Sequence, residues 1–345
     1  AKRCGKAPIY RAEDIEGVMS LWKTEGYHKK IVVKDITAEF YDAGHILGSS
    51  SVMLEAEGKK IIFSGDLGHA PASLINEFEE IKEADYAVME STYGNRLHQE
   101  VLLRRHLLED VIEDTLKRKG ALIIPAFAME RTQELLYELN ELVESGRIPR
   151  VPVFLDSPLA IKLTAIYKKY ERDGQYFNQR SLHSIHKGDA IFQFPGLQMV
   201  LKSKDSRRIK NTPNPKIIIA GSGMSQGGRI VHHEKEYLPD EKSTLLFVGY
   251  QAENSMGRKI LDGAKEVQVM DETVPVRASI KNIDGYSAHA DQNLLLKWLQ
   301  PMKYGLKAVY LVHGEDDQIN PLAQKIRDFM AVKAVIPDVG ETVEL

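Results

Sequence analysis

The chain has 345 residues, of which 43% are hydrophobic and 28% charged, which argues against a disordered or fibrous protein. Its 46 basic and 49 acidic residues give a net charge of −3, so any nucleic acid must bind at a local basic groove. The single cysteine, Cys4, excludes a disulfide framework and favours a reducing, cytoplasmic compartment, and no apolar run approaches the ~20 residues of a membrane span.

The N-terminal part of the chain predicts one helix followed by antiparallel strands. Apolar residues recur at helical spacing in 14–23, and β-rich runs follow at 30–33, 37–41, 51–57 and 59–66. No helical run separates these four, so we expect antiparallel pairing, with Gly58-Lys59 as the turn between the last two.

After Asp66, predicted strands alternate with predicted helices. Strands are expected at 85–91, 121–127, 151–156, 216–223, 244–250 and 309–315, and helices at 101–118, around 135–143, after Ser157-Pro158, near Arg229 and from about Pro321. This alternation is typical of a parallel sheet covered by helices. The least regular stretch, 172–215, holds a basic cluster: Lys202, Lys204, Arg207, Arg208 and Lys210.

Histidine and carboxylate side chains stand where several predicted strands end. They are His45, Asp66, Glu90, His289 and His313. Each has an ordinary alternative, since a loop histidine is usually solvated and an acid after a strand often caps a turn. Together they would meet at one sheet edge, where ligands and catalytic groups gather. Two histidines and a carboxylate with an open position are typical of hydrolytic zinc sites.

A glycine-rich segment, 221–229, lies between a predicted strand and a predicted helix. Its backbone N–H groups could converge on an anion, and Arg229 could add a guanidinium fork, although a plain turn is the alternative. Arg258 follows Ser255, a second candidate helix cap, and its alternative is a solvated surface charge. The candidate phosphate-binding residues are Ser222, Gly223, Gly227, Gly228, Arg229 and Arg258.

In combination, these motifs resemble the metallo-β-lactamase-fold nucleases of the β-CASP group, which include bacterial RNA-processing ribonucleases and the catalytic subunit of the eukaryotic pre-mRNA 3′-end cleavage complex. The matching motifs, in family order, are GHILGS (44–49), SGD (64–66), MESTYGN (89–95), PAFAMERTQELL (125–136), LDSPLA (155–160), GSGMSQGGR (221–229), VGYQAENSMGR (248–258), GYSAHAD (285–291) and LVHGE (311–315).

The resemblance implies a role for each candidate. His45 would bind the first of two zinc ions, Asp66 would bridge both as part of the catalytic centre, and His313 would bind the second. Glu90 and His289 would form the catalytic pair that manages the leaving-group proton. Because DNA-acting relatives usually have valine where His313 stands, the histidine indicates an RNA substrate.

One family motif, HxHxDH, which supplies four metal ligands, is absent. None of the 11 histidines lies in such a motif. The two closely spaced pairs, His183/His186 and His232/His233, do not have the spacing that the motif requires. We therefore expect the chain to be a fragment lacking the N-terminal part of its catalytic domain, and to bind zinc weakly by itself.

The expected fold is α/β: an incomplete metallo-β-lactamase αββα sandwich over 1–98, an inserted β-CASP α/β domain over 99–270, and a return to the sandwich over 271–345, the RNA-specificity region. The expected function is zinc-dependent hydrolysis of single-stranded RNA by a metal-activated hydroxide. The sequence leaves open whether cleavage is endonucleolytic or 5′-exonucleolytic, and whether the protein forms a homodimer. Two alternatives are an RNA-binding remnant without catalysis and a hydrolase of small esters or thioesters.

Overall fold

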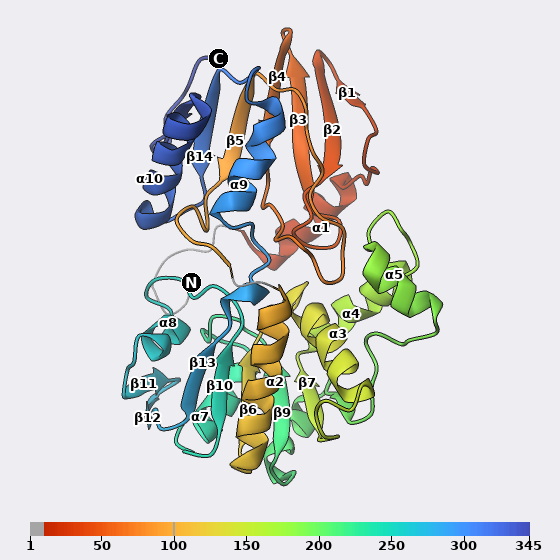
Figure 1. Ribbon diagram of the computed structural model, residues 1–345, viewed down its shortest axis with the longest axis vertical. Coiled ribbons are helices and arrows are strands. Elements are labelled where there is room, and N and C mark those ends of the chain that lie inside the picture. The colour runs from red at the N-terminus through yellow and green to blue at the C-terminus, as the bar shows by residue number, and fades with distance from the viewer. Residues whose placement is uncertain (1–9, 99–100) are drawn as a thin grey trace.

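Two β-sheets organise the fold, one in each lobe of an elongated molecule (Figure 1). The computed structural model describes residues 10–98 and 101–345, so Cys4 lies outside the described residues. Helices and strands mix in both lobes, which confirms the predicted α/β class. Within the described ranges, no helix has both the length and the apolar character that crossing a bilayer requires.

The sheet of the first lobe has seven strands in the order β1-β2-β3-β4-β5-β14-β15. Their bounds are β1 (Ile31–Val33), β2 (Ile36–Asp42), β3 (Ser50–Ala56), β4 (Lys59–Phe63), β5 (Tyr86–Glu90), β14 (Ala308–Val312) and β15 (Lys333–Val335). Strands β1 to β4 pair antiparallel, as predicted, and the others continue in parallel. The β3–β4 turn is Glu57-Gly58 rather than Gly58-Lys59, because Lys59 already pairs with Ala56.

Helices cover one face of this sheet. α9 (Gln292–Leu299) and α10 (Asp316–Lys325) share a buried core with Ile62, Met89 and Leu311, which point to that face. α10 begins at Asp316, earlier than the predicted start near Pro321. The acidic residues of its first turn complement the helix dipole and favour this earlier start.

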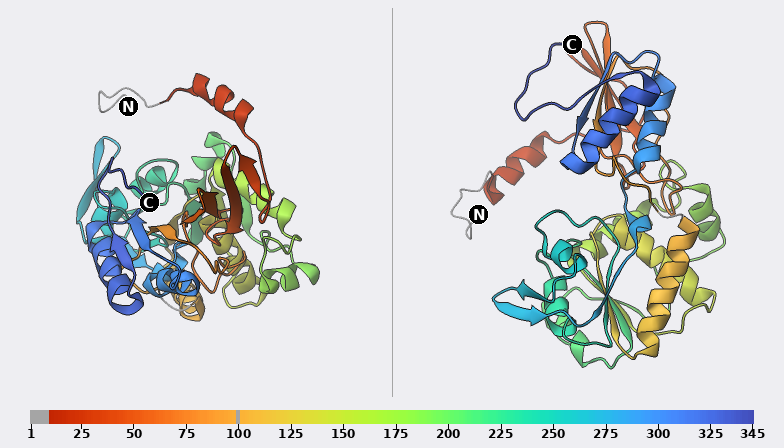
Figure 2. Two further views of the ribbon diagram at one scale, coloured as in Figure 1. Left: turned by 90° about the horizontal axis from the view of Figure 1, so that it is seen from above. Right: turned by 60° about the vertical axis from the view of Figure 1, so that its left-hand side comes forward.

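The opposite face of the sheet carries an apolar row that is only partly buried. Phe63, Val88 and Tyr310 occupy one row of it by strand register, and Phe63 is 37% exposed. α1 (Ala12–Leu21) forms as predicted, but it buries none of its residues and projects away from the body of the lobe (Figure 2). Among the described residues, the first lobe thus contains one sheet with helices on one side, which is half of an αββα sandwich.

The sheet of the second lobe is entirely parallel, in the order β13-β10-β6-β9-β7-β8. Its strands are β6 (Ala121–Pro125), β7 (Val153–Asp156), β8 (Leu197–Met199), β9 (Lys216–Ala220), β10 (Thr244–Phe247) and β13 (Ser279–Asn282). The central strands are buried along their whole length, as expected for a parallel sheet covered on both faces. Separate apolar clusters fill the two sides.

The helices of the second lobe follow the predicted alternation. They are α2 (Val101–Lys117), α3 (Arg131–Glu144), α4 (Pro158–Tyr170), α5 (Gln179–His186), α6 (Ser203–Ser206), α7 (Ile230–Tyr237) and α8 (Met256–Leu261). Ser157 caps α4 as predicted, because its Oγ accepts a hydrogen bond from the backbone N–H of Ala160 at 3.3 Å. A hairpin of β11 (Glu266–Val269) and β12 (Glu272–Pro275) follows α8. Since β13 pairs with β10, the chain leaves this sheet after Asn282.

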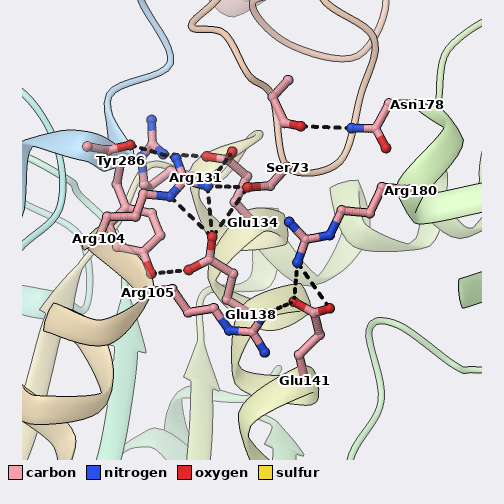
Figure 3. Close-up of polar contacts among 12 residues, drawn as sticks. Ser73, Arg104, Arg105, Arg131, Glu134, Glu138, Glu141, Asn178, Arg180 and Tyr286 are labelled. Atoms are coloured by element: carbon pink, nitrogen blue, oxygen red, sulfur yellow. Dashed lines mark hydrogen bonds and ion pairs between the residues drawn. The ribbon is translucent and has the colours of Figure 1, made fainter. Parts of the chain in front are cut away.

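A buried polar network joins the two lobes where the chain crosses between them (Figure 3). Arg104 of α2 donates to Glu138 of α3 at 2.8 Å and to the backbone carbonyl of Gly285 at 2.6 Å. Its guanidinium also reaches Ser73, in the segment after β4, and Tyr286 donates to Glu138. Removing one partner of such a buried pair typically costs about 3–5 kcal/mol, so the network holds the crossing segments in fixed positions.

Candidate metal centre

His45 lies in the loop between β2 and β3, and both lobes hold that loop. The backbone N–H of His45 donates to Ser49 Oγ at 3.0 Å, and that of Leu47 donates to the hydroxyl of Tyr167 in α4 at 3.3 Å. Burial, followed by the nearby His289, lowers the pKa of His45 to about 4. Its imidazole is therefore neutral near pH 7, which is the form that binds a metal ion.

Asp66 follows β4 and lies between two histidines. Its Oδ2 is 3.9 Å from Nε2 of His45, and its Oδ1 is 3.2 Å from Nδ1 of His313. The hydrogen bond from His313 lowers the pKa of Asp66 to about 2 and raises the pKa of His313. His313 directly follows β14 with φ +54°, a left-handed conformation that is uncommon outside glycine. The carboxylate is thus anionic and shared by two imidazoles.

Glu90 and His289 form a second pair beside the first. The Glu90 carboxylate ends β5, is 1% exposed, and accepts a hydrogen bond from the Leu67 N–H at 2.6 Å. Both of its oxygens lie 3.1 Å from Nδ1 of His289. Because an ionised carboxylate only accepts hydrogen bonds, it places a proton on Nδ1 and leaves Nε2 free to meet a metal or a leaving group.

The five candidate residues meet at one place although they span positions 45 to 313 of the chain. The ring centroids of His45 and His289 are 4.4 Å apart, and those of His289 and His313 are 5.8 Å apart. One ligand atom each from His45, Asp66 and His289 lies within 4.8 Å of the others. His289, expected to transfer protons, therefore also stands where a ligand could, while His313 reaches Asp66 from outside this group.

The residues present fit one zinc ion. Nε2 of His45 faces Oδ2 of Asp66 at 3.9 Å, which is longer than a hydrogen bond, so this nitrogen is left for a metal ion. Two imidazoles and a carboxylate are the three-ligand set of many catalytic zinc sites, which keep a fourth position open.

A cleft of about 530 Å³ opens between the lobes over this group. His45, His289 and His313 line one side, and residues of the second lobe line the other: Phe127, Met129, Arg131, Met224 and Tyr250. Sequence reasoning missed the second group, because most of its members are apolar or aromatic residues that carry no recognisable chemistry, and Arg131 lies in a helix with no local signal for a site. Their position directly after β6, β9 and β10 was the available signal, since those strands end at one sheet edge.

The glycine-rich loop, 221–229, follows β9 and folds on itself. The N–H of Ser222 donates to the carbonyl of Gly227, and the N–H of Ser225 donates to the carbonyl of Ser222, both at 3.2 Å. Gly228 has φ +70°, and a Cβ there would come within 2.3 Å of the Gly221 oxygen. Part of the loop's N–H groups are thus used internally.

The two predicted phosphate-binding arginines already have partners within the protein. Arg229 donates through Nη1 to Asp156 at 2.7 Å and through Nη2 to the Leu201 carbonyl at 2.7 Å. Arg258 donates through Nε to both carboxylate oxygens of Asp262 at 3.0 Å. A phosphate contact by Arg229 would therefore use its Nε and the nearby backbone.

Glu234 of α7 supports the loop and should make stability depend on pH. It accepts a hydrogen bond from Ser225, while its second oxygen is buried without a partner in the described structure. Burial raises its pKa from 4.5 to about 7. The charged form is therefore disfavoured in the folded state, and stability falls as pH rises from 4.5 towards 7.

We expect Glu234→Gln to raise the free energy of unfolding by about 3 kcal/mol at about pH 8 and to have little effect at about pH 5. Urea unfolding followed by circular dichroism measures both values. Glu236→Gln, an exposed change on the same helix, is the control. An equal gain at the two pH values would contradict the assignment of this titration to Glu234.

Comparisons with known proteins match two segments of the chain to family models. Residues 132–260 match the Beta-Casp domain model, and residues 273–337 match the Zn-dependent metallo-hydrolase RNA specificity domain model. The chain is 35% identical to Ribonuclease TTHA0252 of Thermus thermophilus, over 92% of this chain and 72% of the relative. It is 34% identical to the RNase J-like protein of Methanocaldococcus jannaschii, over 95% of this chain and 76% of the relative. Transcription termination factor FttA of Thermococcus kodakarensis is 32% identical, and the chain spans 54% of its length.

Proposed function

The chain belongs to the β-CASP family of metallo-β-lactamase-fold ribonucleases, and from this premise we propose that it acts by zinc-dependent hydrolysis of phosphodiester bonds in single-stranded RNA. The observation that carries the proposal is the convergence of His45, Asp66, Glu90, His289 and His313 on one cleft. A hydrolase family alone would not require these side chains to meet.

His45 and Asp66 would hold zinc, with His289 or His313 completing the site. When bound, zinc would supply Lewis acidity to a phosphoryl oxygen. The remaining roles belong to the chain's own side chains. Glu90 keeps a proton on Nδ1 of His289 and so orients the ring, and Nε2 of His289 would pass a proton to the leaving oxygen.

The opposite side of the cleft suits an RNA strand. Phe127 is 42% exposed beside the cleft, and Tyr250 lines it too, so both rings could stack on bases. The loop N–H groups of 222–228 would meet a phosphate. His313, which stands where DNA-acting relatives usually have valine, supports RNA as the substrate.

We expect the chain with saturating zinc to cleave a labelled single-stranded RNA slowly, to stop when the metal is chelated, and to spare DNA of the same sequence. The slow rate follows from the missing HxHxDH ligands, which also predict weak zinc binding. Gel analysis of the products measures cleavage, and equilibrium dialysis measures zinc.

The same assay separates the alternatives. RNA binding without zinc-dependent cleavage would favour a non-catalytic RNA-binding protein, and turnover of a small thioester in place of RNA would favour the esterase alternative. Two zinc ions retained against mild chelation would contradict the expectation of weak binding.

A further inference from the structure

A second cavity, of about 470 Å³, lies in the second lobe and shares no lining residue with the catalytic cleft. It is bounded by the segment 203–210 and by α7. Arg207 and Lys210 of the basic cluster in 202–210 line it, together with Arg229, His232 and His233. The fold thus gathers cationic and imidazole side chains from two separate segments around one cavity.

The inner end of this cavity is a buried polar network centred on Asp156, the last residue of β7. Its carboxylate is fully buried and accepts hydrogen bonds from Ser206 at 2.6 Å, Arg229 at 2.7 Å and His233 at 2.8 Å. Burial alone would raise the pKa of Asp156, but these hydrogen bonds lower it instead. The network therefore keeps the Asp156 carboxylate ionised and fixes the positions of the His233 imidazole and the Arg229 guanidinium, which line the cavity.

The mouth of the cavity carries positively charged side chains that are exposed to solvent. Arg207 and Lys210 are exposed, and neither forms an ion pair with any described residue. Lys235 also lines the cavity, but it pairs with Glu272 at 2.6 Å. Glu236 is the one carboxylate among the lining residues, against four cationic side chains.

We propose that this cavity is a phosphate-binding site outside the catalytic cleft, and that its ligand is a backbone phosphate of RNA or the phosphate of a free nucleotide. Arg207 and Lys210 would contact the phosphate from the mouth, with Arg229 Nε and His232 beside them. The volume falls within the range of small-molecule sites, about 300–1,000 Å³, which is enough for one nucleotide.

The position of the cavity favours the RNA source. The loop 221–229 contributes Met224 to the catalytic cleft and Arg229 to this cavity. An RNA strand that passes over the loop would meet both places, so the cavity would add a phosphate contact remote from the reacting bond. The choice of RNA over a free nucleotide as the ligand rests on the proposed function, whereas the proposed affinity of the cavity for phosphate does not.

The test compares two double variants of the same segment. Arg207→Ala with Lys210→Ala removes both mouth cations, and Lys204→Ala with Arg208→Ala removes the same charge from exposed residues outside the cavity. Fluorescence anisotropy of a labelled single-stranded RNA across a salt series gives the affinity. We expect the cavity variant to bind at least about tenfold more weakly, with a log–log salt slope lower by about 0.7 for each lost contact, and the control to stay near wild type.

Calorimetric titration with AMP distinguishes the two sources. AMP binding by the wild type that the cavity variant loses would assign the site to a free nucleotide, and a loss confined to RNA would assign it to the strand. Equal behaviour of the two double variants in both titrations would overturn the proposal. Failure of the proposed function would look different, because RNA would then go uncleaved by the wild type whatever the cavity variants bind.

Discussion

Asp66→Asn is expected to lower zinc affinity by more than about 100-fold, since even outer-shell partners of metal ligands contribute 10–100-fold. The carboxylate lies 3.9 Å from Nε2 of His45 and 3.2 Å from Nδ1 of His313, and its pKa of about 2 keeps it anionic at every useful pH. Asparagine keeps the shape and removes the charge. Competition with a fluorescent zinc chelator measures the affinity.

The pH dependence gives this experiment a second readout. Because the bond to Asp66 raises the pKa of His313, protons compete with zinc for that imidazole, and wild-type affinity should rise with pH as His313 loses its proton. The variant lacks the carboxylate, so its rise should begin at lower pH. Asp110→Asn, an exposed acid on α2, should behave like the wild type. Zinc affinity unchanged by Asp66→Asn would remove Asp66 from the metal site.

His289→Ala is expected to slow RNA cleavage by about 10²–10⁴-fold, the usual contribution of a positioned general acid or base. Glu90→Gln should slow it as well, because an amide no longer requires a proton on Nδ1 of His289, which the carboxylate now contacts at 3.1 Å. Single-turnover cleavage with excess protein and zinc measures the rate, and RNA anisotropy measures binding, which should change little.

The zinc affinity of His289→Ala decides between the two roles that geometry allows. An unchanged affinity would support proton transfer, and a large loss would make His289 a ligand, as its distance to His45 and Asp66 permits. His186→Ala, which removes an exposed histidine from α5, is the control. Cleavage that survives both His289→Ala and Glu90→Gln would remove the pair from the mechanism.

Much of the fold and of the candidate site could be predicted from the sequence because the signals are local. The apolar runs before Asp66, Glu90 and His313 form strands, and each polar residue stands at or just after the end of its strand. Parallel strands bring such ends to one edge, so the meeting of these residues follows from their strand positions. The motifs added the family, and the comparisons confirmed it.

Local sequence signals predicted element boundaries and strand pairing less well where contacts with other segments set them. The turn at Glu57-Gly58 and the start of α10 differ from prediction by a few residues, because strand register and an acidic first turn set them. β13 belongs to the second sheet because it pairs with β10, and no local signal encodes that long-range pairing.

By itself the sequence predicted candidate zinc ligands, where the strands end, and which family the chain resembles, because periodicity and motifs act within short segments. Tertiary structure alone decided which partners the charged side chains take. Arg229, at the start of α7, reaches Asp156 at the end of β7, and the basic cluster meets α7 around one cavity. Those pairings depend on how the parallel sheet orders its strands, and strand order is a long-range property that no local pattern encodes.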